Sequence, residues 1–292
     1  MLARLGIDTP PRGKFPSPFR PDNNPSCEIY KDMVHDWSTG KYYDSIAVFA
    51  EMKGLSNSDA IKQLAAELPG RVPKIPEKQH TLEIPPLHFD AEKAKVVAKS
   101  RGLSPLSTEV AGVTLGTMGF ANVGGYPCWL LSDGSNHVAE ARRIDSKVFP
   151  AYKGLGERKG HTLRGSKKSW PVGLKPRKGR IADDHKIVLV EGGPDYLAAC
   201  DLFAVTDREF LPVAMLGAMR CSIHPDALRI MKGREVLILA HPDLAGIDAA
   251  KDWRSQLLDA GAKVCLKQLS GGDLNDLVAR EGAEVIAKEV LK

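Results

Sequence analysis

The sequence has 292 residues, of which 43% are hydrophobic and 26% are charged, and this composition excludes wholesale disorder. A chain of this length can form two or three modest domains. Its net charge of +5 is compatible with nucleic-acid binding but does not establish it, because the distribution of charge matters more than the sum. We find no apolar run long enough to span a membrane and no signal peptide, so we expect a cytoplasmic protein with no membrane partner.

The cysteines are scattered along the chain, and no two of them are spaced as C-x-x-C: Cys27, Cys128, Cys200, Cys221 and Cys265. This arrangement argues against a disulfide framework and against a zinc site built from cysteines. We therefore expect a protein whose thiols stay reduced.

Residues 1–70 predict a small module of short strands and two helices. The pattern places strands at 27–30 and 34–37 and begins the helices after Asp44 and Ser56, which are both good N-caps. Three aromatic residues are the candidate anchors of its core: Phe19, Tyr30 and Trp37. Residues 71–88 are rich in proline and predict a semi-extended linker.

Residues 89–180 predict a small α+β region with a basic character. A helix is expected at 91–100 and a hairpin at 126–144, and five basic residues are the candidate nucleic-acid and nucleotide ligands: Arg142, Arg143, Lys153, Lys167 and Lys168. Such cations can bind backbone phosphate and offset charge on a transferring triphosphate. A solvated basic face is the alternative interpretation.

Residues 181–292 predict an α/β domain with a parallel sheet. Hydrophobic strands at 186–190, 211–216, 235–240 and 262–266 alternate with segments of helical periodicity. In such sheets, ligands bind at the carboxyl ends of the strands. Acidic residues placed there supply the oxygen ligands that Mg²⁺ prefers.

Three motifs in this last domain carry a family resemblance: Glu191-Gly-Gly-Pro-Asp195, His241-Pro-Asp243-Leu-Ala-Gly246 and Gly272-Asp273-Leu-Asn-Asp276. In this order they resemble the Toprim domain that primases, topoisomerases and some nucleases share. The resemblance implies catalytic roles for Glu191, Asp243 and Asp195, with Mg²⁺ or Mn²⁺ as cofactor. It implies metal ligands at Glu191, Asp243, Asp273 and His241. Helix capping is the alternative role for Asp195, Asp273 and Asp276.

His241 departs from the family pattern, which has an aspartate at this position. A neutral imidazole binds transition metals but is a poor ligand for Mg²⁺. The replacement leaves three outcomes open: a preference for Mn²⁺, a single remaining metal ion, or loss of catalysis with binding retained.

The N-terminal module is similar to the zinc ribbon that precedes bacterial and phage primase cores. The family's C-P-F-H motif corresponds to Ser17-Pro-Phe-Arg20, and its C-x-x-C knuckle falls in Asp36-Trp-Ser-Thr-Gly40. Because every zinc ligand is missing, we expect a zinc-ribbon-like module without zinc. No Walker A pattern occurs, so we expect no helicase domain within this sequence.

We therefore predict a DNA primase-like protein of a phage or plasmid, which synthesises short RNA primers with a divalent metal ion. Its partners would be a single-stranded DNA template, nucleoside triphosphates and a separate replicative helicase. Two alternatives stay open: a Toprim-type nuclease, and a non-catalytic nucleic-acid-binding accessory protein of replication.

Overall fold

The computed structural model describes residues 2, 5–10, 13–30, 33–67, 81–151, 156–178, 185–206, 209–216 and 222–291. The chain forms two compact units, residues 1–78 and 79–292. Most of the predicted linker lies outside the described residues, as does Lys153. No helix in the described ranges has the length and apolar character needed to cross a bilayer.

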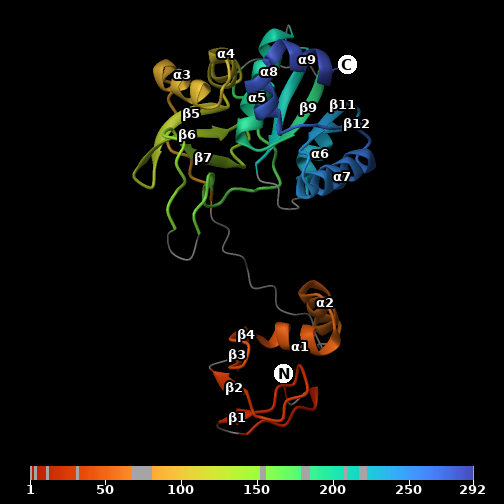
Figure 1. Ribbon diagram of the computed structural model, residues 1–292. Helices are drawn as coiled ribbons and strands as arrows, with labels where there is room; N and C mark the ends of the chain where they lie inside the picture. The colour runs from red at the N-terminus through yellow and green to blue at the C-terminus, as the bar shows by residue number, and fades with distance from the viewer. Residues whose placement is uncertain are drawn as a thin grey trace. The chain divides into compact units, whose positions relative to one another are not determined.

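The first unit is a four-stranded antiparallel sheet followed by two helices (Figure 1). The strands pair in chain order: β1 (Lys14–Phe15), β2 (Cys27–Tyr30), β3 (Met33–Asp36) and β4 (Lys41–Tyr43). The helices are α1 (Ser45–Lys53) and α2 (Asn57–Glu67). Both begin at the predicted caps, because Asp44 accepts hydrogen bonds from two amides of α1 and the Ser56 hydroxyl accepts one from Asp59 N–H.

The core of the first unit is small and does not contain two of the predicted aromatic anchors. Phe15, Cys27 and Val34 are buried in it, and Phe19 packs against it. Tyr30 and Trp37 are 54% and 55% exposed, so the prediction that they anchor the core is wrong. Tyr30 is the last residue of β2, whose burial falls from Cys27 to Tyr30, and Trp37 lies in the turn after β3.

The second unit begins with helices and an antiparallel sheet. Helix α3 (Ala91–Ser100) starts at the predicted cap Asp90, and α4 (Pro105–Glu109) continues into a π-helical turn, η2 (Val110–Thr114). The sheet pairs its strands in chain order: β5 (Met118–Val123), β6 (Tyr126–Ser132), β7 (Ala139–Arg143) and β8 (His161–Thr162).

A parallel sheet follows, which confirms the predicted α/β class. Its strands lie in the order β10 (Phe210–Met215), β9 (Lys186–Glu191), β11 (Glu235–Ala240) and β12 (Lys263–Gln268). Its helices are α5 (Gly193–Val205), α6 (Pro225–Met231), α7 (Leu244–Asp259), α8 (Leu274–Glu281) and α9 (Ala283–Val290). Helices α5, α8 and α9 pack together on one side of the sheet, and α6 packs with α7 on the other (Figure 1).

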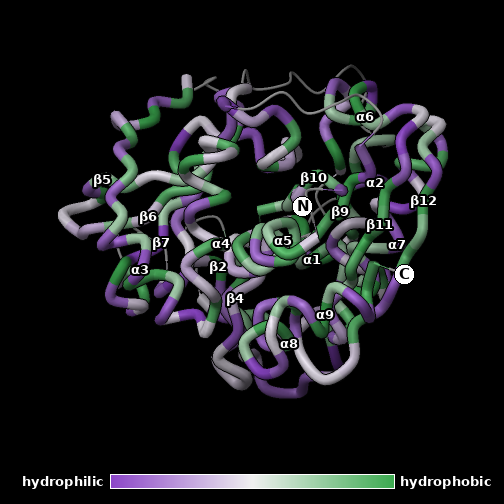
Figure 2. The backbone as a smooth tube through the Cα atoms, turned by 90° about the horizontal axis from the view of Figure 1, so that it is seen from above, coloured by the Kyte–Doolittle hydropathy of each residue, from purple (hydrophilic) through white to green (hydrophobic). Residues whose placement is uncertain are grey.

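The two sheets of the second unit share one hydrophobic core. The inner residues of β9 and β11, 187–190 and 236–240, are hydrophobic (Figure 2) and are buried in the same cluster as Trp129 and Trp170 of the preceding region. Polar contacts also join the two parts, since the buried hydroxyls of Thr117 and Tyr196 lie 2.8 Å apart. The described residues on the two sides of the predicted boundary at residue 180 therefore pack into one core. The site at the sheet edge lies on this shared core.

Candidate functional site

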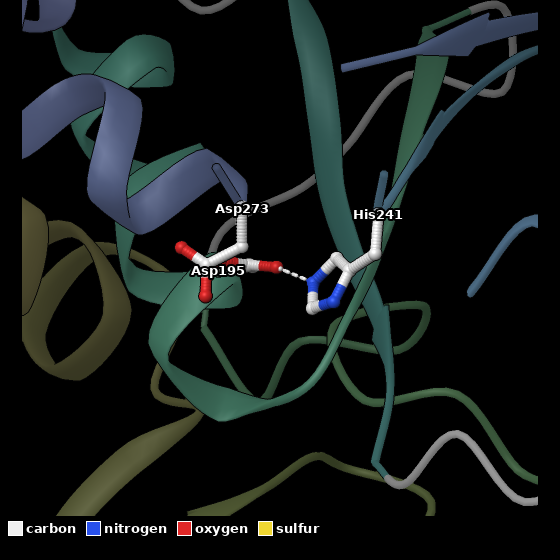
Figure 3. A group of neighbouring side chains, drawn as sticks. All are labelled: Asp195, His241 and Asp273. Carbon is white, nitrogen blue, oxygen red and sulfur yellow. Dashed lines mark hydrogen bonds and ion pairs between the residues drawn. The ribbon is translucent and has the colours of Figure 1, made fainter. Parts of the chain in front are cut away.

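The acidic residues named from the sequence gather at the carboxyl edge of the parallel sheet. Strand β9 ends at Glu191 and β11 ends just before His241, and parallel neighbours end at the same edge. Asp195 lies in the first turn of α5, and Asp273 precedes α8. Asp195, His241 and Asp273 each offer one ligand atom, and these atoms all lie within 4.8 Å of one another (Figure 3).

The centre of this group is a buried contact between His241 and Asp195. His241 Nε2 lies 2.5 Å from Asp195 Oδ2. The backbone N–H of Asn275 donates to Asp195 Oδ1 at 2.9 Å. The hydrogen bond to Asp195 raises the pKa of His241 to about 9, against the effect of burial. Burial raises the pKa of Asp195, while its two hydrogen bonds act in the opposite direction. The two side chains therefore share a proton across this contact, and the raised pKa of His241 favours its imidazolium form at neutral pH.

Glu191 supplies a carboxylate with an unused oxygen beside this pair. Its Oε2 is buried and accepts no hydrogen bond from the described residues. Burial raises its pKa, the charge of His241 lowers it, and the charges of Asp243 and Asp195 raise it. A buried carboxylate oxygen without a partner is costly, and a bound cation or a substrate proton would satisfy it.

Asp243 and Asp273 both cap helices. Asp243 Oδ1 accepts the amide of Gly246 at 2.7 Å, and Asp273 Oδ1 accepts the amide of Asp276 at 2.8 Å. The capping alternative thus applies to Asp273, and Asp243 is a further cap that the sequence analysis did not name. It does not apply to Asp195, which lies inside α5, or to Asp276, which is exposed in the first turn of α8. Each cap uses one of two carboxylate oxygens.

The donor set fits a divalent metal ion. Carboxylate oxygens with one imidazole nitrogen suit Mn²⁺ and other transition metals better than Mg²⁺. Of the ligands named from the sequence, His241 and Asp273 belong to the close group, and Asp195 is its third member. Glu191 and Asp243 act on the same site through their charges.

Arg142 and Arg143 point to opposite sides of β7, as neighbours in a strand do. Arg142 Nε donates to Glu140 at 2.7 Å and lies against the start of α5, where a Cβ on Gly193 would be 3.3 Å from it. Arg143 pairs with Asp145 and lies over the Tyr126 ring, 4.1 Å from its centroid. Arg142 is therefore the arginine that approaches the acidic site.

Arg101 is a site residue that the sequence analysis missed. Its Nε is buried and has no hydrogen-bond partner in the described part of the chain. Burial lowers its pKa, the charge of Arg142 lowers it further, and the charge of Asp273 raises it. Two neighbouring guanidiniums beside a carboxylate can bind an anion that bridges them. The residue ends α3 before Gly102, a common place for a cation, so its position carried no functional signal.

Lys167 and Lys168 are both exposed. The amide of Lys167 donates to His137 O at 2.7 Å, and its charge contributes to a lowered pKa of His137, whose main cause is burial. No contact among the described residues links either lysine to the acidic group.

The comparisons with known proteins found similar solved structures, and those described below are of primases. No protein-family model and no curated protein matches the chain. The similar solved structures include the Aquifex aeolicus primase (zinc-binding and RNA polymerase domains), with 19% identity over 95% of this chain and 78% of that chain and a TM-score of 0.43. The primase fragment of the bacteriophage T7 primase-helicase protein has 16% identity over 95% and 98% of the chains and a TM-score of 0.43.

A third similar structure is the RNA polymerase domain of the Mycobacterium tuberculosis primase in complex with double-stranded DNA. It has 20% identity over 70% of this chain and 75% of that chain, with a TM-score of 0.47. At these identities and TM-scores, no residue role carries over from the solved structures to this chain.

Proposed function

We propose that the protein is a primase-like nucleotidyltransferase of Toprim type, which builds short RNA primers on single-stranded DNA for a phage or plasmid. The observation that carries this proposal is the grouping of Asp195, His241 and Asp273 at the carboxyl edge of a parallel sheet, next to Glu191 and two arginines. Carboxylates that hold a divalent cation, with guanidiniums beside them, match the charge of a triphosphate substrate.

The residues divide into three roles in the proposed reaction. Asp195, His241 and Asp273 would hold Mn²⁺ or Mg²⁺, with Asp243 beside them, and the ion would supply charge stabilisation for phosphoryl transfer. Glu191, whose pKa is raised, would accept the proton of the attacking hydroxyl. Arg101 and Arg142 would bind phosphate groups of the triphosphate and of the template and offset their charge.

The first unit offers a surface that suits single-stranded nucleic acid. The ring of His35 stacks on Tyr42 at 4.1 Å and lies 4.2 Å from Trp37, and Tyr42 and Trp37 are more than half exposed. Lys14 Nζ lies 5.2 Å from the centroid of the Trp37 ring. Exposed aromatic rings with a nearby cation form a stacking platform that accepts any base.

One observation favours a second candidate, a non-catalytic accessory protein that binds nucleic acid. The imidazolium of His241 neutralises Asp195 without a metal ion, so the acidic group could persist as a structural element. In that case Glu191 would have no metal-bound substrate whose hydroxyl it could deprotonate.

The test is primer synthesis on mixed-sequence single-stranded DNA with labelled nucleoside triphosphates, in Mg²⁺ and separately in Mn²⁺. We expect short products with the wild type, at least a hundredfold fewer with Glu191→Gln, and wild-type amounts with Asp248→Asn, an exposed carboxylate of α7. Shortened template without new product would support a nuclease instead. Salt-sensitive DNA binding without either reaction would support the accessory protein.

A further inference from the structure

A hydrogen-bonded cluster of charged and hydroxyl side chains connects two loops of the first unit. The Asp36 side chain is fully buried, and Arg20 binds both of its oxygens, with Nη2 at 3.1 Å from Oδ1 and Nη1 in contact with Oδ2. The Arg20 guanidinium also donates to the hydroxyls of Ser17 and Ser26, at 3.1 Å each, and to that of Ser38. The guanidinium thus joins the loop before β2 to the turn after β3.

The carboxylate of Asp36 is held as an anion by this cluster. The Arg20 hydrogen bonds hold the pKa of Asp36 well below its usual range, and Ser38 and Thr39 lower it further. Ser38 contributes its amide at 3.0 Å and its hydroxyl at 2.8 Å. A bidentate arginine–carboxylate pair of this kind is among the stronger and more directional contacts in proteins.

The cluster occupies the four positions that the zinc-ribbon resemblance assigns to metal ligands. Ser17 and Arg20 stand for the first ligand pair, and Asp36 and Thr39 for the knuckle pair, and all four take part in the same hydrogen-bonded network. Zinc does not fit here, because the four positions hold no cysteine or histidine and Arg20 already supplies a permanent cation. The Cys27 thiol borders the network through Ser17 and Ser26, but burial raises its pKa, which disfavours the thiolate that binds zinc.

We propose that the Arg20–Asp36 ion pair replaces the structural metal ion of a zinc ribbon, so that the first unit folds without metal. A structural zinc ion contributes to folding by binding side chains from two separate loops. Arg20 makes the same connection between loops with one side chain and five hydrogen-bond contacts. This inference is independent of the catalytic activity of the second unit.

The first test uses the indole N–H signal of Trp37, which lies between Asp36 and Ser38 and donates to Glu28 at 3.1 Å. We expect the signal in a ¹⁵N-correlated spectrum of the full chain to be unchanged by EDTA, and we expect no stoichiometric zinc by elemental analysis. Loss of the dispersed Trp37 signal on chelation, or one bound zinc ion per chain, would overturn the proposal.

The second test changes the pair itself. Asp36→Asn and Arg20→Met should each lose the native Trp37 signal, whereas Lys62→Ala, which breaks an exposed ion pair of α2, should keep it. The double variant Arg20→Met/Asp36→Leu removes both charges and should recover part of the signal, since no buried charge is left unpaired. Retention of the Trp37 signal in both single variants would show that the first unit folds without the Arg20–Asp36 pair.

The third test restores a metal site. We expect Ser17→Cys/Arg20→His/Asp36→Cys/Thr39→Cys to bind Co²⁺ one to one with the absorption of a tetrahedral thiolate site, and to lose the Trp37 signal on addition of EDTA. The matched control is Ser17→Cys/Asp36→Cys/Thr39→Cys, which keeps Arg20 and should bind Co²⁺ at least tenfold more weakly. If the fourfold variant binds no Co²⁺, the four positions do not share the geometry of a metal site, and the proposed replacement is refuted.

Discussion

At the scale of single residues, the most informative feature is the cation at His241, where the resembling family has an aspartate. The substitution changes the charge of the metal-binding edge, because Asp195 meets an imidazolium 2.5 Å away instead of a second carboxylate. Binding of a metal ion through the His241 nitrogen requires that nitrogen to be free of its proton. The His241 nitrogen can therefore carry the proton that pairs with Asp195, or it can lose this proton and bind a metal ion, but it cannot do both at once.

We predict that the His241 imidazole in the metal-free protein titrates near pH 9, well above the ordinary histidine value. Asp195→Asn should lower the pKa of His241, because the largest cause that raises it is lost, while the charges of Glu191 and Asp273 still oppose the effect of burial. Since the pKa is raised on folding, the pair stabilises the folded state fully below pH 6.5, and this contribution is lost as the pH rises through about 9. NMR titration of the ring nitrogens measures both values, and an ordinary pKa in the wild type would contradict the ion pair.

A second residue-scale prediction concerns the choice of metal ion. If the protein catalyses primer synthesis, the wild type should be more active in Mn²⁺ than in Mg²⁺, because imidazole is a poor Mg²⁺ ligand. His241→Asp should shift the ratio of Mg²⁺ to Mn²⁺ activity upward by about tenfold or more, as expected for an oxygen donor in place of nitrogen. Initial rates across a metal titration give this ratio. An unchanged ratio would exclude His241 as a ligand.

At the scale of elements, the first turn of α5 positions the site against the antiparallel sheet. Gly192 adopts a positive φ of 84°, and its amide donates to Met215 O at 2.8 Å, so β10 fixes the turn that follows β9. A Cβ on Gly193 would lie 3.2 Å from Leu131 and 3.3 Å from Arg142. The close packing brings Arg142 and Asp195 to the same end of α5.

We predict that Gly193→Ala lowers the free energy of unfolding by about 1–3 kcal/mol, the usual cost of overpacking a buried contact. Any primer synthesis should fall more than binding of nucleoside triphosphate, because the turn carries Asp195. Gly156→Ala is the matched control, since a Cβ there meets nothing within 4 Å. Denaturant unfolding of both variants measures the difference, and equal stability would show that the helix start can move freely.

The sequence predicted the elements whose periodicity is strong and missed those that depend on packing. The strands of the parallel sheet appear within two residues of the predicted bounds, because each is a continuous apolar run. Helix α8 was implied only by the capping alternative for Asp273 and Asp276 and had no predicted bounds, since the short segment 269–273 separates it from β12 and Gly282 then divides it from α9. The packing of α3, α5 and α8 brings Asp195 into the close group as its third member. The same packing places Arg101 beside this group. No local pattern in the sequence reports that packing.

At the scale of the whole molecule, the chain contains two units with separate cores, and we propose a different nucleic-acid-binding surface on each. The first unit presents aromatic rings, and the second presents the guanidiniums of Arg101 and Arg142 next to carboxylates. Stacking on rings depends weakly on salt, whereas contacts of cations with phosphate depend on it strongly. The two surfaces should therefore be separable by experiment.

We predict that Trp37→Ala/Tyr42→Ala weakens binding of single-stranded DNA by roughly 1–3 kcal/mol per stacked base without changing its salt dependence. Arg142→Ala should weaken binding and reduce the slope of log affinity against log salt by about 1, as expected for one phosphate contact. Fluorescence anisotropy at several salt concentrations measures both quantities. Lys62→Ala serves as the surface control, and wild-type affinity in the aromatic variant would mean that the first unit has no role in nucleic-acid binding.

The strand order of the parallel sheet has a consequence for synthesis on the ribosome. Central strand β9 pairs with β11, which leaves the ribosome much later, and Asp195 is made before the histidine that neutralises it. A nascent chain that ends before residue 241 therefore holds a carboxylate that cannot be buried without a charge penalty. We expect the second unit to complete its fold late and in one step, once His241 and the amide of Asn275 have both emerged.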